Sequence, residues 1–360
     1  MRAPTTMRAM VTMGHGGLDQ MQLHDDWPCP RLADDDVLIK VGACGLNNTD
    51  VNTRSGWYSK TVTDRTTGDA FDEVDDQDPT WGGRPLSFPR IQGADACGEI
   101  VAVGANVDPA RIGQRVITDN WLRDPKDPLN KDLAGYLGSE CDGGFAEYTA
   151  IPAVNALAVQ SDLTDAELAT FSCSYSTAEG MLERARVGAD DTVLVPGASG
   201  GVGGALVQLA KLRGARVIAL ASEAKHPDVL ALGADRILPR QPEQLKDVLA
   251  DETVTVVADI VGGDYWPQLI DLLQRGGRYT CSGAIAGPMV AFDLRTFYLR
   301  DLTFTGSTVI GPNIMPTIIR YIEQGAIKPS LAATYPLAEL REAQAAFIAK
   351  KHTGNIVVCP

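Results

Sequence analysis

We predict an α/β protein composed of a mostly β domain and a doubly wound parallel-sheet domain, from three features of the sequence. The chain has 360 residues, more than one ordinary hydrophobic core organises. In its first part, apolar and polar side chains alternate as in half-buried strands at 36–44, 97–104 and 114–118, between frequent Gly and Pro. After Leu163, strand-like and helix-like segments alternate, which is typical of a parallel sheet covered by helices.

The change of pattern also sets the expected domain boundaries. Thr164, followed three positions later by Glu167, forms a capping-box pattern that predicts the start of a helix. The last segment of the chain carries amphipathic helical patterns and a closing strand, and we expect it to complete the first domain. We therefore predict that residues 1–158 and 300–360 form the first domain and residues 159–299 form the second.

Composition argues against several classes of partner. The formal net charge is −14 and no Lys/Arg cluster occurs, so we expect neither a nucleic-acid partner nor an anionic membrane surface. No apolar stretch is long enough for a signal peptide or a membrane span. The seven cysteines are scattered and include no C-x-x-C pair, which favours reduced thiols in a cytoplasmic protein.

The clearest functional motif lies in residues 192–225. A buried apolar strand leads into a glycine-rich turn and then a helix, and a second strand follows. Ala198, Gly200 and Gly203 stand at the G-x-G-x-x-G positions, which serve a tight turn, the approach of a pyrophosphate, and close packing of helix on strand. Free N–H groups at the start of the helix favour an anion. The predicted pyrophosphate-binding residues are Ala198, Ser199, Gly200, Gly201, Val202 and Gly203.

The end of the second strand bears on the choice between NAD and NADP. Sites that prefer NAD usually place an acidic side chain about 20 residues after the glycines, where it binds the ribose 2′-hydroxyl. Ser222 stands there instead, and Lys225 and His226 follow, which suits a 2′-phosphate. Glu223 argues the other way. NADP is therefore the favoured cofactor, with Ser222 and Lys225 as its specificity residues, and NAD is the alternative.

Residues 59–90 form a segment that is acidic between Asp69 and Asp78 and rich in turn formers. One interpretation is a solvated surface loop. The other is an insertion that walls a substrate pocket and lines it with Trp57, Tyr58 and Trp81.

Several segments together resemble the medium-chain dehydrogenase/reductase superfamily, which includes zinc alcohol dehydrogenases and zinc-free quinone and enoyl reductases. These segments are 42–58, 88–104, 143–151, 195–211 and 299–311. The resemblance implies a GroES-like β domain, a Rossmann domain, and a tail that rejoins the first domain. The stretch 283–294 resembles the segment through which relatives pair their Rossmann sheets, so a homodimer is expected; an ordinary final strand with a covering loop is the alternative.

The resemblance breaks down at the catalytic zinc ligands of the alcohol dehydrogenases. A catalytic zinc needs three protein ligands and an open position. Asn47 stands where the first Cys ligand is expected and Ala94 where a His is expected, whereas Cys173 retains the third. A thiolate with one amide and one methyl group does not make a zinc site, and Asp95 adds only a weak ligand. We therefore predict no metal.

The stretch from Asn47 to Tyr58 resembles the quinone oxidoreductase and acryloyl-CoA reductase branches, and this resemblance favours NADPH. Asn47 and Tyr58 are the candidate hydrogen-bond donors to a substrate carbonyl. Asp50 and Arg54 are further catalytic candidates, with an internal ion pair as their alternative role. Tyr58 could equally pack against its neighbour, and Cys173 could be a reactive thiol or a buried bystander.

The leading hypothesis is NADPH-dependent, metal-free hydride transfer to an activated C=C bond, of the enone or acrylate type, or to a quinone. The alternatives are an NADP-dependent alcohol or aldehyde dehydrogenase, and an NADPH-binding protein with little catalytic activity. The expected partner is a small-molecule substrate. By resemblance, we expect the nicotinamide between the side of Asn47 and Thr177 and the strand ends at Val261, Gly262, Ser282, Gly283 and Ala284.

Overall fold

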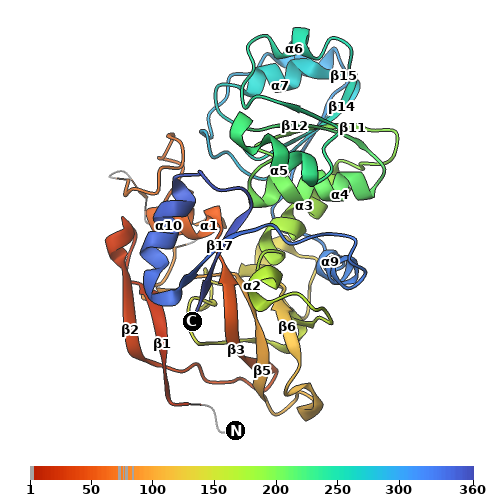
Figure 1. Cartoon of the computed structure of the whole chain (residues 1–360). Coiled ribbons are helices and arrows are strands. Elements are labelled where there is room, and N and C mark those ends of the chain that lie inside the picture. The colour runs from red at the N-terminus through yellow and green to blue at the C-terminus, as the bar shows by residue number, and fades with distance from the viewer. Residues whose placement is uncertain (1–3, 72–73, 76, 78–79, 83–84) are drawn as a thin grey trace. The chain divides into compact units, whose positions relative to one another are not determined.

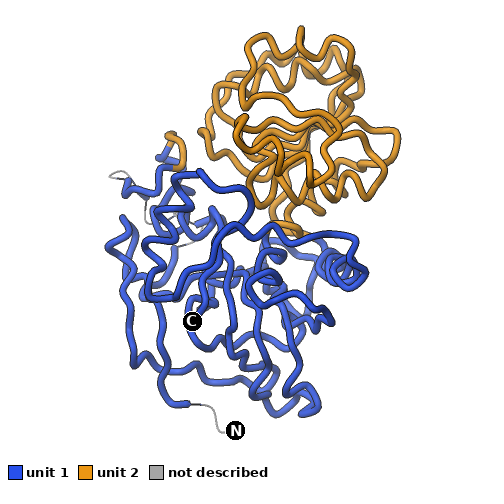
Figure 2. Tube along the Cα trace, viewed as in Figure 1, with its two compact units in different colours: residues 1–62, 67–173, 311–360 blue, residues 63–66, 174–310 orange. Residues whose placement is uncertain are grey.

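The computed structural model describes residues 4–71, 74–75, 77, 80–82 and 85–360. The chain divides into two compact units, unit 1 with residues 1–62, 67–173 and 311–360, and unit 2 with residues 63–66 and 174–310 (Figure 2). The boundaries thus fall after residues 173 and 310, rather than after 158 and 299 as the sequence pattern suggested. The first moves because α2 (Asp165–Leu168) packs on strands of unit 1, and the second because β16 (Thr303–Gly306) pairs with a strand of unit 2.

Unit 1 is built on mostly antiparallel strands. Its largest sheet has the order β10-β6-β5-β3-β18-β17, with β9 also paired to β3, and a smaller sheet has the order β2-β1-β4. The bounds of the larger sheet are β3 (Asp36–Gly45), β5 (Asp95–Val103), β6 (Arg115–Thr118), β9 (Tyr148–Pro152), β10 (Ala156–Ala158), β17 (Leu331–Pro336) and β18 (Asn355–Cys359). The smaller sheet comprises β1 (Thr6–Thr12), β2 (Met21–Pro28) and β4 (Arg90–Ile91), and β7 (Trp121–Leu122) pairs with β8 (Gly135–Tyr136).

The C-terminal tail contributes both strands and helices to unit 1. Strand β18 pairs antiparallel with β3, with Val357 opposite Gly45, and parallel with β17. The tail also supplies α9 (Ile314–Glu323) and α10 (Leu340–Ile348). Thus the end of the chain and the strand that leads to Asn47 belong to the same sheet.

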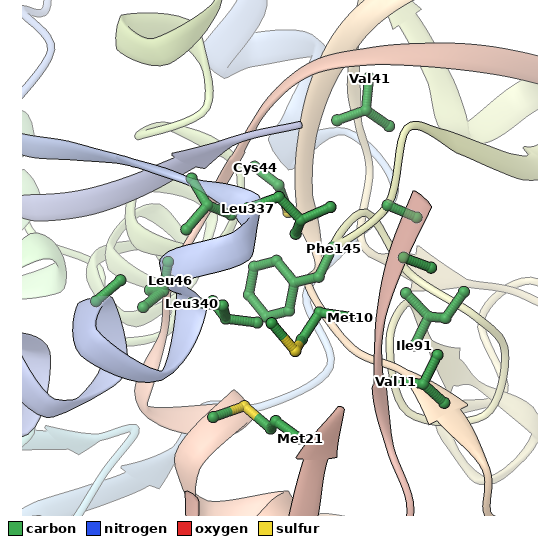
Figure 3. Close-up of a cluster of buried hydrophobic side chains, with 14 of the residues drawn as sticks. Met10, Val11, Met21, Val41, Cys44, Leu46, Ile91, Phe145, Leu337 and Leu340 are labelled. Atoms are coloured by element: carbon green, nitrogen blue, oxygen red, sulfur yellow. The ribbon is translucent and has the colours of Figure 1, made fainter. Parts of the chain in front are cut away.

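A hydrophobic cluster fixes the end of β3 and the start of α1 (Asn48–Ser55). Phe145 packs there among side chains from distant parts of the sequence, including Met10 and Leu340 (Figure 3). Cys44 and Leu46 belong to the same cluster and are at most 1% exposed. Burying a large apolar side chain contributes about 1.5–3 kcal/mol. This packing holds the backbone on the N-terminal side of Asn47 in place.

Unit 2 is a doubly wound α/β unit with a six-stranded parallel sheet of order β13-β12-β11-β14-β15-β16. Its strands are β11 (Thr192–Pro196), β12 (Arg216–Leu220), β13 (Arg236–Leu238), β14 (Val254–Asp259), β15 (Leu273–Cys281) and β16. Its helices include α3 (Ser172–Arg184), most of which belongs to unit 2, α4 (Gly201–Leu212), α5 (His226–Ala231), α6 (Leu245–Val248), α7 (Trp266–Leu272) and α8 (Leu294–Tyr298). Helices α4 and α7 flank the sheet on opposite sides (Figure 1).

This strand order is that of the Rossmann fold, so the predicted fold class is confirmed. The order reverses between β11 and β14, and in such sheets ligands bind at the carboxyl ends of the strands on either side of the reversal. Among the described residues, no helix is long and apolar enough to cross a membrane.

Candidate functional site

Asn47 and Asp50 form the beginning of α1. Asn47 is the N-cap residue, and its backbone N–H donates to the Asp50 carboxylate at 2.7 Å. Such a contact satisfies one N–H that the first helical turn leaves without a partner. Burial raises the pKa of Asp50 from 3.8 to about 7, and the hydrogen bond from Asn47 opposes this shift. The Asn-x-x-Asp pattern therefore positions Asn47, with Asp50 as its support.

Arg54 is fully buried near the end of α1 but is not paired with Asp50. Its guanidinium donates to the Gln344 side-chain oxygen at 3.2 Å, to the Gly68 carbonyl at 3.1 Å and to the Gly16 carbonyl. Burial lowers its pKa to about 10. The salt bridges between described residues include none from Arg54 to Asp50, so the ion-pair interpretation is wrong. These contacts make Arg54 a support between three segments, and its catalytic role stays a prediction.

A buried polar cluster surrounds Asp95, the first residue of β5. One oxygen of this carboxylate accepts from the Asn120 side-chain amide at 2.8 Å and from the Cys173 backbone N–H at 3.0 Å. Asp95 and Asn120 are 2% and 3% exposed. Burial raises the pKa of Asp95 to about 6, while the amide groups of Asn47, Asn120 and Cys173 favour its charged form. The structure thus brings Asn47 and Cys173, which stand at two of the three expected zinc-ligand positions, together around Asp95, which follows the third position, Ala94.

These residues do not fit a catalytic zinc. The Asp95 carboxylate already accepts from two amide groups, and Asn47 contributes a neutral amide where a charged or imidazole ligand is needed. Across the part of the chain that the structure describes, no three His, Cys, Asp or Glu side chains are grouped so that they could hold a metal ion.

The amide nitrogen of Asn47 is buried without a hydrogen bond of ordinary geometry. A contact with the Asp95 carboxylate favours the charged form of Asp95, but it can use at most one of the two N–H groups of this amide. Asn47 is 7% exposed, and an unsatisfied buried donor costs about 1–3 kcal/mol. An unsatisfied donor at this position is available to a ligand oxygen.

Tyr58 lies near the same cluster. Its hydroxyl interacts with the side chains of Thr49 and Asn52, and burial raises its pKa. The negative charges of Cys173 and Asp50 also raise the pKa of Tyr58, so these three groups lie near one another. Trp57 meets the Tyr58 ring edge to face, with ring centres 5.7 Å apart. The contact with Trp57 fits the packing role, and the donor role of Tyr58 stays a prediction.

Three aromatic rings, those of Trp81, Trp121 and Tyr136, connect the polar cluster around Asp95 to the segment 59–90. Trp81 packs edge to face on Trp121 with ring centres 4.8 Å apart, and Trp121 packs in the same way on Tyr136 at 4.8 Å. The Tyr136 hydroxyl accepts from Asn120 at 3.3 Å. The Glu140 carboxylate accepts from the Tyr136 backbone N–H at 2.7 Å and from the Trp81 indole at 3.4 Å.

Sequence reasoning missed Asn120, Trp121 and Tyr136. The only local signal is that polar and aromatic residues follow the strand at 114–118. Asn120 meets Asp95 because β6 and β5 are neighbours, with Ile117 opposite Cys97, and no spacing in the sequence shows this pairing.

In unit 2, the glycine turn has the conformation that its motif predicts. Gly197, and not Ala198, takes the left-handed conformation, with φ +68°, so the alanine at the first motif position is tolerated. A Cβ at Gly203 would lie 2.2 Å from the Gly197 carbonyl oxygen, so close packing requires this glycine. A Cβ at Gly200 would meet nothing closer than 3.7 Å, and φ there is −83°. Gly200 therefore has no internal reason to be glycine, which fits a site that a pyrophosphate approaches.

The other predicted cofactor residues gather at the carboxyl edge of the sheet. The Asp259 carboxylate at the end of β14 accepts from the Val261 N–H at 2.7 Å and from the Gly262 N–H at 3.3 Å. The Val261 carbonyl accepts from the Ala286 N–H at 2.8 Å, which joins this loop to the one that contains Ser282, Gly283 and Ala284. A Cβ at Gly197 would lie 2.9 Å from the Val261 side chain, so the glycine turn adjoins the same loop.

The remaining predicted cofactor residues lie at the sides of this edge. Ser222 follows β12 and caps the short 3₁₀ helix Glu223–Lys225. The His226 ring interacts with the Ala221 carbonyl at 3.2 Å, so it is turned to the backbone. Thr177 lies half-buried on α3. Its position against a nicotinamide stays a prediction.

A Rossmann unit with an intact glycine turn, joined to a β unit with a buried polar cluster, defines the class of dinucleotide-dependent oxidoreductases. Residues 33–161 match the family of alcohol dehydrogenase GroES-like domains, and residues 201–324 match the family of zinc-binding dehydrogenases. A candidate alcohol dehydrogenase from Sinorhizobium meliloti, known from its crystal structure, has a sequence that is 45% identical to this chain. The match covers 99% of this chain and 98% of that one, with a TM-score of 0.89.

Curated relatives are more distant. The acryloyl-coenzyme A reductase of Metallosphaera sedula is 25% identical over 98% of this chain and 99% of its own length. The chloroplastic NADPH-dependent alkenal/one oxidoreductase of Arabidopsis thaliana is 28% identical over 99% of this chain and 80% of its own length. The chain therefore belongs to the medium-chain dehydrogenase/reductase superfamily, in its quinone/enoyl reductase-like branch, and is an oxidoreductase. The resemblance inferred from the sequence is confirmed.

Proposed function

We propose that this protein is an NADPH-dependent reductase that transfers hydride, without a metal, to an activated C=C bond of an enone or acrylate-type compound or to a quinone. The observation that carries this proposal is the buried, unsatisfied amide nitrogen of Asn47 beside Asp95. Where a metal enzyme polarises the substrate oxygen with zinc, this chain offers a fixed hydrogen-bond donor.

Asn47 and Tyr58 are the proposed donors to the substrate carbonyl oxygen, on which negative charge develops during reduction. The Asn47–Asp50 hydrogen bond and the core under Leu46 hold the donor in place before the substrate binds, so little reorganisation is needed. Asp95 and Asn120 keep the surrounding groups hydrogen-bonded. Because the proposed chemistry needs one proton for the substrate, water is a sufficient proton source.

The carboxyl edge of unit 2 is the proposed cofactor site. The turn at Ser199–Gly203 would hold the pyrophosphate, the loops at Val261 and Ser282–Ala284, with Thr177, would hold the nicotinamide, and Ser222 and Lys225 would bind the 2′-phosphate. When bound, NADPH supplies the hydride. The NADPH dependence of the Arabidopsis relative supports the choice of cofactor.

The test is to follow NADPH oxidation with an enone, a quinone and an acryloyl thioester, and NADP⁺ reduction with simple alcohols. We expect turnover with at least one of the first group and none with alcohols. The similarity to a candidate alcohol dehydrogenase supports the competing dehydrogenase function. Steady NADP⁺ reduction with alcohols would establish that alternative, and tight NADPH binding without any turnover would indicate a cofactor-binding protein.

We also propose that the protein is a homodimer that pairs through unit 2. Several large apolar side chains are exposed between β15 and β16, namely Met289, Val290, Leu294, Tyr298 and Leu299. Strand β16 is the last of the sheet, so its outer edge has no strand partner among the described residues. Solvated apolar groups beside a sheet edge are typical of protein interfaces.

A cytoplasmic location is proposed as well. All seven cysteines are unpaired, which supports a reducing compartment.

A further inference from the structure

The ends of β12 and β13 lie side by side at the proposed cofactor edge. The two strands are parallel neighbours, and Leu220 stands opposite Leu238. The Ala221 N–H then donates to the Leu238 carbonyl at 3.2 Å, so the pairing continues just beyond β12. Ser222 and Arg240 each lie two residues after the Leu220–Leu238 pair. The register therefore brings Arg240 to the same edge as the residue that ends the dinucleotide-binding motif.

Arg240 also lies close to Lys225. The charge of Arg240 lowers the pKa of Lys225, in addition to the larger effect of burial, and Asp228 partly opposes both. Arg240 is exposed, and it has no salt bridge or hydrogen bond to another residue that the structure describes. Two like charges thus approach each other in a chain whose net charge is −14. Such an arrangement costs energy in the free protein and is relieved when an anion binds between the charges.

We propose that Arg240 is a second cation of the cofactor site and that Ser222, Lys225 and Arg240 together bind the 2′-phosphate of NADP(H). This inference rests on the proposed function, because it assumes that the cofactor binds along the carboxyl edge of unit 2. A phosphate monoester carries about −1.5 to −2 charges at neutral pH, which matches two cations better than one. Arginine also offers two parallel N–H donors to a phosphate.

The site explains why Glu223 does not decide in favour of NAD. Glu223 is exposed, and it opens the short 3₁₀ helix that ends at Lys225. Lys225 and Arg240 offset the negative charges of Glu223 and Asp228, and both offer N–H donors that a phosphate can use. A 2′-phosphate is therefore attracted, whereas the uncharged 2′-hydroxyl of NADH gains little.

The experiment measures the dissociation constants of NADPH and NADH by calorimetry for the full chain and for three variants. Arg240→Gln removes the charge, and Arg240→Lys retains it without the paired donors. Arg186→Gln is the matched control, because Arg186 is also exposed in unit 2 but precedes β11, at the amino end of the sheet. The fragments 2′,5′-ADP and 5′-AMP isolate the 2′-phosphate from the rest of the cofactor. Thermal unfolding of each variant shows that the fold is intact.

We expect Arg240→Gln to weaken binding of NADPH and of 2′,5′-ADP by on the order of 10- to 100-fold, with less than about a twofold effect on NADH and 5′-AMP. Arg240→Lys should recover part of the loss, and Arg186→Gln should match the wild type. Equal effects of Arg240→Gln on NADPH and NADH, or no effect on either, would overturn the role of Arg240 while leaving NADPH use intact. A wild-type chain that binds NADH as tightly as NADPH would instead overturn the proposed cofactor, and the inference with it.

Discussion

The side-chain amide of Asn120 donates to the Asp95 carboxylate at 2.8 Å, inside a cluster that also contains Asn47 and the Cys173 backbone N–H. By resemblance, the zinc dehydrogenases of the superfamily place metal ligands at two of these positions, 47 and 173. Here, hydrogen bonds between neutral amides and one carboxylate occupy the same positions. The cluster therefore organises hydrogen-bond donors around one buried carboxylate.

Replacing Asn47 with Ala should remove the proposed donor to the substrate oxygen. We expect kcat/KM with the best acceptor to fall by about 100- to 1,000-fold, the usual effect of losing one donor to a developing oxyanion. The dissociation constant of NADPH should change less than twofold. Asn48→Ala is the control, because the Asn48 side chain instead accepts from Lys350 at 2.9 Å. Equal losses in the two variants would show that Asn47 acts only through the structure of α1.

The two motif glycines should respond differently to alanine. Gly203→Ala should lower the melting temperature, because the new Cβ would lie 2.2 Å from the Gly197 carbonyl oxygen. Gly200→Ala should fold with a normal melting temperature, because its Cβ meets no atom within 3.7 Å, but it should weaken NADPH binding at least tenfold. Calorimetric scanning and titration separate the two effects. If Gly200→Ala binds NADPH normally, the pyrophosphate does not approach this residue.

Asp50 should make the stability of the protein depend on pH. Burial raises its pKa from 3.8 to about 7, so between these values the folded chain holds a proton that the unfolded chain has released. The free energy of unfolding should therefore fall as pH rises through this window, by up to about 4 kcal/mol for a shift of about three units. Asp95, with a pKa of about 6, acts in the same direction.

Asp50→Asn keeps an acceptor for the Asn47 N–H but has no proton to lose. Urea denaturation at pH 5 and pH 7.5 should show a smaller loss of stability for this variant than for the wild type. The exposed Asp162→Asn variant should behave as the wild type does. Parallel pH profiles for Asp50→Asn and the wild type would show that Asp50 is not the titrating group.

Leu294→Asp should dissociate the proposed dimer. Leu294 is 67% exposed in the single chain, so the substitution should leave the melting temperature of the monomer almost unchanged, whereas a charge would be buried if the surface pairs. Light scattering should show a dimeric wild type and a monomeric variant. The control is Leu129→Asp, since Leu129 is 73% exposed in unit 1. A monomeric wild type would contradict the proposal directly.

Trp81→Ala should raise the KM for acceptors with bulky apolar groups by severalfold, because Trp81 packs on Trp121 and Tyr136 next to Asn120. NADPH affinity should remain unchanged. Small acceptors should be affected less, since they reach fewer of the three rings. An equal increase in KM for small and bulky acceptors would count against a role of these three aromatic rings in substrate specificity.

Local sequence was sufficient for the parts of this protein that depend on neighbouring residues. The alternating strands, the Thr164–Glu167 capping box and the glycine turn at 198–203 all arise from contacts within a few positions of the chain. Their side-chain periodicity and cap chemistry are local, so the α/β fold class and the Rossmann unit could be predicted.

Tertiary structure decided the contacts between residues distant in the sequence. Asn120 meets Asp95 only because β5 and β6 pair, and Arg54 reaches Gln344 because the C-terminal tail returns to unit 1. Arg240 reaches the carboxyl edge of unit 2 through the register of β12 and β13. Each of these contacts depends on strand order and register, which single-sequence periodicity does not encode. The sequence by itself therefore determined the fold class and the glycine turn, and the tertiary structure decided which side chains gather around Asp95 and at the carboxyl edge of unit 2.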